Sequence, residues 1–254
     1  MCILNDLSFL NKKFEKQSST PFVTEIPSKS LQLKCQLKYS VFMNKNFLKS
    51  LFETIKSKAG FNKPPKFSSL EEIISYVEEQ AAYVSQTTLY GYVKTRAGTQ
   101  WPKLFNDETY LISLRMARWY IFGACVADLA LFICSRLVVE TNLSEQKAED
   151  LCGRITDAIL LNNSQTDIDQ SEFVAMASRA KARASYLSWR SAAEEPITFK
   201  ESADAFVRWA PMAEEFKDQD EEIMRNSIHL RWIGVRREVR EQMKSKVISQ
   251  LTEI

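Results

Sequence analysis

The stretch that decides the fold is the apolar segment 119–139, WYIFGACVADLALFICSRLVV, in which only Asp128 and Arg136 carry charge. A membrane-spanning helix needs about 20 consecutive apolar residues, and ionisable side chains within it are costly in lipid. A helix that is apolar on nearly all sides also suits the centre of a helical bundle. We therefore predict a buried core helix, reaching from about Asp107 to Glu140, around which other helices pack.

The sequence on both sides of this segment has helical spacing. Residues 68–72, SSLEE, place a glutamate three residues after each serine, which is typical of a helix start, and Gly98 and Pro102 are expected to close that helix. Ser144 and Ser171 predict the starts of helices that run to about Leu161 and Trp189. The last helix is expected to start near Asp218–Asp220, with an apolar seam formed by Met224, Ile228, Trp232, Val235, Val239 and Met243.

No run of alternating apolar and polar residues has the length of a strand. The chain has only 6 glycines and 7 prolines in 254 residues, too few for the frequent tight turns of a sandwich or barrel. We predict an all-α fold: a single-domain bundle of about six to seven helices, in residues 68–254, around the central apolar helix.

The N-terminal part differs in charge from the rest. Residues 1–67 contain 12 lysines and 4 acidic residues, although the whole chain has a net charge of only +2. We expect residues 1–42 to be a disordered basic leader that is dispensable or lies upstream of a true start at Met43. A basic amphipathic helix and a proline linker are expected over 43–67. The helix at 44–59 is expected either to dock on its own domain or to contact an anionic membrane surface.

The composition argues against several classes of enzyme and of metal site. The chain has one histidine, His229, and no P-loop, GxGxxG, GxSxG or HExxH motif. Its 5 cysteines lack CxxC spacing, so we expect neither zinc nor structural disulfides, and the unpaired thiols predict a reducing compartment, the cytoplasm. We expect no metal and no cofactor.

Asp128 is the acidic residue of greatest interest because it lies in the apolar segment. An unpaired charge there would be costly to bury. Three interpretations stand: a buried ion pair that fixes how helices pack, a neutral carboxyl group, or a carboxylate that faces a ligand. The expected partners in an ion pair are Arg96, Arg208, Arg225 and Arg231.

Arginine and tryptophan occur close together at several places in the chain. Arg115 and Arg118 share one face of the central helix, and arginines beside tryptophan suit a phosphate or carboxylate. Alternatively, each arginine pairs locally with Glu71, Glu108, Glu214 or Glu221. The predicted binding residues are Arg96, Trp101, Arg115, Arg118, Asp128, Arg208, Trp209 and Arg231.

These features favour a non-enzymatic binding or assembly factor whose Arg/Trp-rich helical surfaces engage a protein partner or a small anionic group. One alternative is a hydrolase of small esters in which His229 is the base, oriented by Asp220 or Glu222. A second is a peripheral membrane factor docked by residues 44–59. Nucleic-acid binding is disfavoured because the helical part is acidic and lacks helix-turn-helix spacing.

Three blocks carry a resemblance to a known family: TLYGYVKTRAGT at 88–99, FVRWAP at 206–211, and DEEIMRNSI at 220–228 continuing through WIGVRRE at 232–238. They resemble an alphaproteobacterial family of uncharacterised all-α proteins that are sometimes loosely labelled esterases. The resemblance covers about residues 68–240. It implies a bacterial cytoplasmic protein and carries over no catalytic residue.

Overall fold

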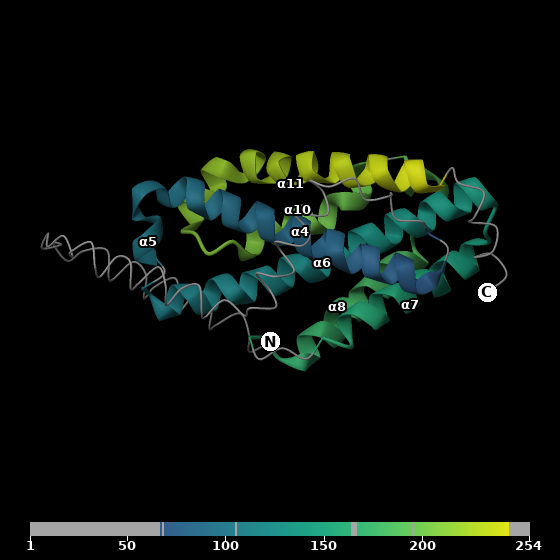
Figure 1. The fold of residues 1–254 in the computed structure, drawn as a ribbon, viewed down its shortest axis with the longest axis horizontal. Helices are drawn as coiled ribbons and strands as arrows, with labels where there is room; N and C mark the ends of the chain where they lie inside the picture. Colours follow the sequence, from purple (N-terminus) through teal and green to yellow (C-terminus); the bar gives the residue numbers. More distant parts are fainter. Residues whose placement is uncertain (1–66, 68, 105, 164–166, 195, 244–254) are drawn as a thin grey trace, which may run out of the picture. The chain divides into compact units, whose positions relative to one another are not determined.

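The computed structural model describes residues 67, 69–104, 106–163, 167–194 and 196–243. The expected leader and the expected helix at 44–59 lie outside this part. Within it there are helices and no strand, so the predicted all-α fold class is confirmed. Six of the described helices have ten or more residues (Figure 1): α4 (Leu70–Ala97), α6 (Glu108–Thr141), α7 (Glu145–Leu160), α8 (Gln170–Ser185), α10 (Lys200–Trp209) and α11 (Glu214–Met243). Shorter turns join them: η1 (Gly98–Gln100), α5 (Trp101–Leu104), α9 (Trp189–Ala192) and η2 (Pro196–Phe199).

Helix α6 is the centre of the bundle, as the apolar segment predicts. Every residue from Tyr120 to Val138 is buried, and α6 packs against α4, α7, α8, α9, α10 and α11 (Figure 1). Among the described residues it is the one helix long and apolar enough to cross a membrane, and its apolar window is covered by the protein's own side chains. Helix α6 is therefore buried in the way that is typical of the core helix of a bundle.

Side-chain caps set the starts of the helices. The Asp107 carboxylate accepts hydrogen bonds from the backbone amides of Thr109 and Tyr110, at 2.9 and 3.1 Å, where α6 begins. Ser69 and Ser144 cap α4 and α7 in the same way, as the sequence predicts. These caps satisfy amides that have no partner within their helix.

Four predicted helix boundaries need correction. Asp169, and not Ser171, caps α8, because its carboxylate accepts from the Ser171 amide at 2.8 Å. That helix ends at Ser185, before the predicted end at Trp189. Helix α11 begins at Glu214, one turn before Asp218. Pro102 does not end α4 but lies in the first turn of α5, where its missing N–H costs nothing.

The last helix contributes an apolar face and one large aromatic side chain to the core. The whole predicted seam of α11 is buried. Trp232 is among the largest fully buried side chains, and its ring lies 4.7 Å from that of Phe199, which in turn lies 5.2 Å from Phe132 of α6. Aromatic contacts of this kind connect α11 to the central helix through η2.

Candidate functional site

Three nitrogen donors of α6 converge on one carboxylate, that of Asp167, in the connection between α7 and α8. Arg115 Nε lies 3.0 Å from Oδ1. Arg118 Nη2 and Trp119 Nε1 lie 3.4 and 3.1 Å from Oδ2. We call Arg115, Arg118 and Trp119 the carboxylate cradle. Two of the predicted binding residues, Arg115 and Arg118, therefore meet at one point.

The helix and its neighbours hold the cradle in place. Arg115, Arg118 and Trp119 fall on one side of α6 because residues three and four apart are neighbours on a helix surface. The Arg118 guanidinium lies 4.4 Å from the centre of the Trp119 ring, a cation–π contact. That indole makes edge contacts with Phe122 and Phe173, which fixes its plane. The donors are therefore pre-oriented.

Charge around the cradle favours an acidic group. Two guanidinium groups face Asp167, whose side chain is only 20% exposed. A second acid, Glu108, contacts Arg115 at 3.2 Å, but it is 73% exposed and so contributes little. Guanidinium pairs and an indole N–H suit a carboxylate or a phosphate, which accepts several charge-assisted hydrogen bonds at once.

Two other predicted residues join α11 to α4. Arg96 makes a two-pronged ion pair with Asp220, whose Oδ2 also accepts from the Tyr92 hydroxyl at 2.9 Å. Arg231 donates to the carbonyl of Thr87 at 3.4 Å. Both arginines thus connect neighbouring helices, and neither reaches the cradle.

The remaining predicted residues are placed separately. Arg208 is exposed and makes no ion pair with any described residue. Trp209 stacks on Tyr120 with ring centres 3.7 Å apart, and Trp101 is partly buried against the core. The predicted binding residues therefore do not form one pocket in the described part of the chain.

Asp128 is fully buried and paired, but not with any of the four predicted arginines. Its Oδ1 pairs with Arg183 of α8, and its Oδ2 accepts from the Ser202 amide at 2.8 Å. The Ser202 hydroxyl accepts from the Trp232 indole at 3.0 Å, so the network joins α6, α8, α10 and α11. Burial raises the pKa of Asp128 to about 6, against the opposing effects of Arg183 and Ser202. The correct partner, Arg183, was missed because nothing in the sequence places α8 beside this part of α6.

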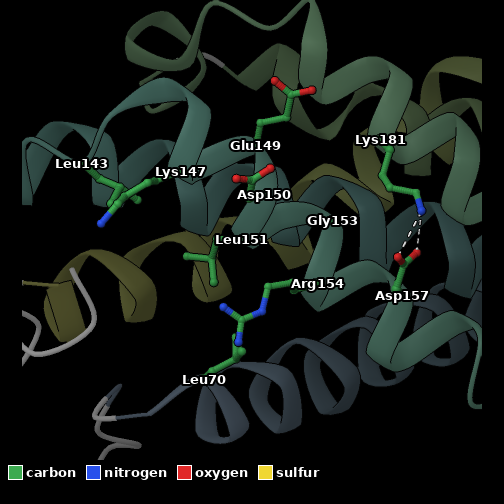
Figure 2. Close-up of a pocket in the computed structure, with 10 residues that line it drawn as sticks. All are labelled: Leu70, Leu143, Lys147, Glu149, Asp150, Leu151, Gly153, Arg154, Asp157 and Lys181. Carbon is green, nitrogen blue, oxygen red and sulfur yellow. Dashed lines mark hydrogen bonds and ion pairs between the residues drawn. The ribbon is translucent and has the colours of Figure 1, made fainter. Parts of the chain in front are cut away.

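A cavity of about 560 Å³ opens between α7, the start of α4 and the end of α8 (Figure 2). In the figure Arg154 points into it toward Leu70, while Asp157 pairs with Lys181 at 3.0 Å. Its lining holds as many acidic as basic side chains, so it is less selective for an anion than the cradle. The lining residues are Leu70, Leu143, Lys147, Glu149, Asp150, Leu151, Gly153, Arg154, Asp157 and Lys181.

His229 lies on α11, half-buried, away from both sites. Burial, with the nearby Arg225 and Arg236, lowers its pKa. Asp220, one of the two acids expected to orient it, is instead held by Arg96 and Tyr92. Neither Asp220 nor Glu222 bonds to the imidazole in the structure.

The described residues contain no group of three His, Cys, Asp or Glu side chains that could hold a metal ion. Cys125, Cys134 and Cys152 are free thiols and are buried. The chain is thus an all-α bundle with a pre-oriented Arg–Arg–Trp cradle. Comparison with family models, curated proteins and solved structures gives no match, so the resemblance to an alphaproteobacterial family stays a prediction.

Proposed function

We propose that this protein is a non-enzymatic binding factor whose carboxylate cradle takes an acidic side chain or chain terminus of a protein partner. The observation that carries the proposal is the convergence of three donors of one helix on the carboxylate of Asp167. In this proposal Asp167 occupies the cradle until a partner's carboxylate replaces it.

The exchange is physically reasonable because one carboxylate replaces another. The two guanidinium groups keep a counter-ion throughout, so neither charge is left bare. Asp167 belongs to a connection between helices, whereas Arg115, Arg118 and Trp119 belong to the most buried helix of the bundle. We therefore expect the three donors to stay in place while the Asp167 carboxylate is exchanged for that of the partner.

Direct titration of the whole chain with a short acidic peptide, N-acetylated tetra-aspartate, tests this function. Asp167→Asn removes the internal competitor while keeping the side-chain shape. Loss of a charge-assisted hydrogen-bonded competitor worth about 1.5–3 kcal/mol should tighten peptide binding roughly tenfold or more. Arg118→Gln should abolish binding. Calorimetry gives the affinity.

Arg208→Gln is the matched control, because Arg208 is exposed and makes no ion pair with a described residue. It should leave peptide affinity unchanged. Circular dichroism of each variant checks that the helices remain. The proposal is wrong if Asp167→Asn binds the peptide no more tightly than the parent chain, or if Arg208→Gln weakens binding as much as Arg118→Gln.

The surroundings of His229 favour binding over ester hydrolysis. A histidine base is usually oriented by a carboxylate. Of the two acids expected in that role, Asp220 is already engaged by Arg96, and Glu222 makes no hydrogen bond to the imidazole. The membrane alternative depends on residues 44–59, which lie outside the described residues, so it stays a prediction. We further propose a cytoplasmic location, which the free thiols of the described cysteines support, and a bacterial source, which rests on the resemblance of the three sequence blocks.

A further inference from the structure

The outward face of α11 carries a row of exposed apolar side chains with seven-residue spacing. Phe216, Ile223 and Leu230 are seven residues apart, and Ile233 follows three residues after Leu230. Their exposed fractions are 47, 61, 67 and 57%. This spacing is the one that helices use to pack along each other in a coiled coil. The opposite face of the same helix holds the buried seam, so α11 has two apolar faces.

Two further features favour a helix as the neighbour of this face. Gly234 is exposed, and a methyl group in place of its hydrogen would meet nothing within 4 Å, so a close approach is open there. The 30 residues of α11 form a rod about 45 Å long. Helix α11 runs along one side of the bundle (Figure 1). A contiguous exposed apolar strip of this kind marks an interaction surface.

Charge along α11 identifies the partner and its direction. Residues 214–224 hold five exposed acidic residues, whereas residues 225–243 hold one exposed arginine, four partly exposed arginines and two glutamates. Two copies of α11 in parallel would bring like charges together. Two copies in antiparallel orientation bring each acidic half beside a basic half. The same surface is thus complementary to itself under a two-fold rotation, which is the requirement of a symmetric dimer.

We infer that this face of α11 binds a second copy of the chain, with the two α11 helices antiparallel. In the register that brings Ile223 of one copy opposite Ile233 of the other, Leu230 faces Asn226, and the acidic half of each helix lies beside the basic half of the other. Glu222 then faces position 234 of the other copy, one helical turn from the exposed Arg237. The inference is independent of the carboxylate cradle, which lies on α6.

Sedimentation of the full chain tests the association. The parent chain should sediment as a dimer at tens of micromolar. Ile223→Asp should sediment as a monomer with unchanged helix content, because Ile223 is exposed in the isolated chain. Val174→Asp is the matched control: Val174 is an exposed apolar residue of α8, 49% exposed, and its substitution should leave the dimer intact.

Cysteine cross-linking tests the direction. A disulfide requires Cα atoms less than about 7 Å apart. An equal mixture of Ile223→Cys and Ile233→Cys chains should give oxidised dimers above the level of the parent chain. Neither variant alone should do so, because ten residues of helix separate the two positions by about 15 Å. A monomeric parent chain, dissociation by Val174→Asp, or cross-linking of Ile223→Cys with itself would each overturn the inference.

Discussion

Asp128 and Arg183 form an ion pair between α6 and α8 in which the carboxylate is fully buried and the arginine side chain is one-quarter exposed. The guanidinium also donates to the Thr198 carbonyl at 2.6 Å, so it connects α8 to the turn before α10 as well. A single arginine of α8 thus neutralises the buried charge of Asp128 and holds both α8 and η2 against the central helix.

Loss of Arg183 should therefore destabilise the bundle strongly. Arg183→Ala leaves a buried carboxylate with the Ser202 amide as its remaining donor, and breaking a buried pair in this way costs roughly 3–5 kcal/mol. Urea denaturation followed by circular dichroism measures the free energy of unfolding. Lys181→Ala is the control, because its pair with Asp157 is well exposed and should contribute less than about 1 kcal/mol. Equal losses in the two variants would contradict the role given to Arg183.

The raised pKa of Asp128 predicts a pH dependence of stability. Its pKa is about 6 in the folded chain and 3.8 ordinarily, so the folded state holds this proton more tightly than the unfolded state. The contribution to stability is complete below the ordinary pKa and is lost as pH rises through 6. As pH rises from about 4 to about 7, the parent chain should therefore lose about 3 kcal/mol of unfolding free energy relative to Asp128→Asn.

Asp204 provides a control of opposite sign for this measurement. Hydrogen bonds from Lys200 and Arg225 hold its pKa below the ordinary value, although partial burial opposes them. The stability that it contributes is present above the ordinary pKa and is lost as pH falls through the lowered one. Asp204→Asn should thus reduce the loss of unfolding free energy that the parent chain shows as pH falls. If Asp128→Asn and Asp204→Asn changed the pH dependence of the unfolding free energy in the same direction, these assignments would be refuted.

Substitution of the one histidine separates binding from hydrolysis. His229→Ala should leave any turnover of p-nitrophenyl acetate at the level of the parent chain, because Asp220 is held by Arg96 and Glu222 makes no hydrogen bond to the imidazole. The assay follows release of p-nitrophenolate by absorbance. Ser227→Ala, on the same helix, controls for a general effect of altering this surface. A fall in rate specific to His229→Ala would restore the hydrolase alternative.

The sequence predicts the fold well where local chemistry decides it. The two charges within the apolar segment favoured a core helix over a membrane-spanning one, and Asp107, Ser69 and Ser144 each supply a capping oxygen immediately before an apolar repeat. Where two polar residues compete for one cap, the prediction fails: Asp169 precedes Ser171 by two residues, and its carboxylate accepts a charge-assisted hydrogen bond from the Ser171 amide.

The contacts of the candidate site depend on helix packing, which the sequence does not contain. Arg115 and Arg118 share a helix face, so their proximity could be predicted. Their common acceptor, Asp167, lies 48 or more residues away in the chain and is one of two acids in the same short connection. Arg183 likewise reaches Asp128 only because α8 packs on α6. Charge spacing along a helix indicates which side chains are neighbours on it, but not which helix faces them.

Close packing of α6 on α8 gives a sharp contrast between two glycines. A methyl group at Gly123 would lie 2.3 Å from the sulfur of Met176 and 3.3 Å from its Cγ, whereas one at Gly91 would meet nothing within 4 Å. Both glycines lie within helices, where alanine is favoured by about 1 kcal/mol. Gly91→Ala should therefore raise the free energy of unfolding by up to that amount. Gly123→Ala should lower it by about 1–3 kcal/mol, because Met176 is buried and must move within a filled core.

A double-mutant cycle measures this overlap directly. If the methyl group and Met176 compete for the same space, Gly123→Ala should cost less in a chain that already carries Met176→Ala, since the smaller side chain leaves room for it. Gly91→Ala should have the same effect in both backgrounds, because nothing near it depends on Met176. Additive effects of Gly123→Ala and Met176→Ala would mean that α6 and α8 are not in contact at this position.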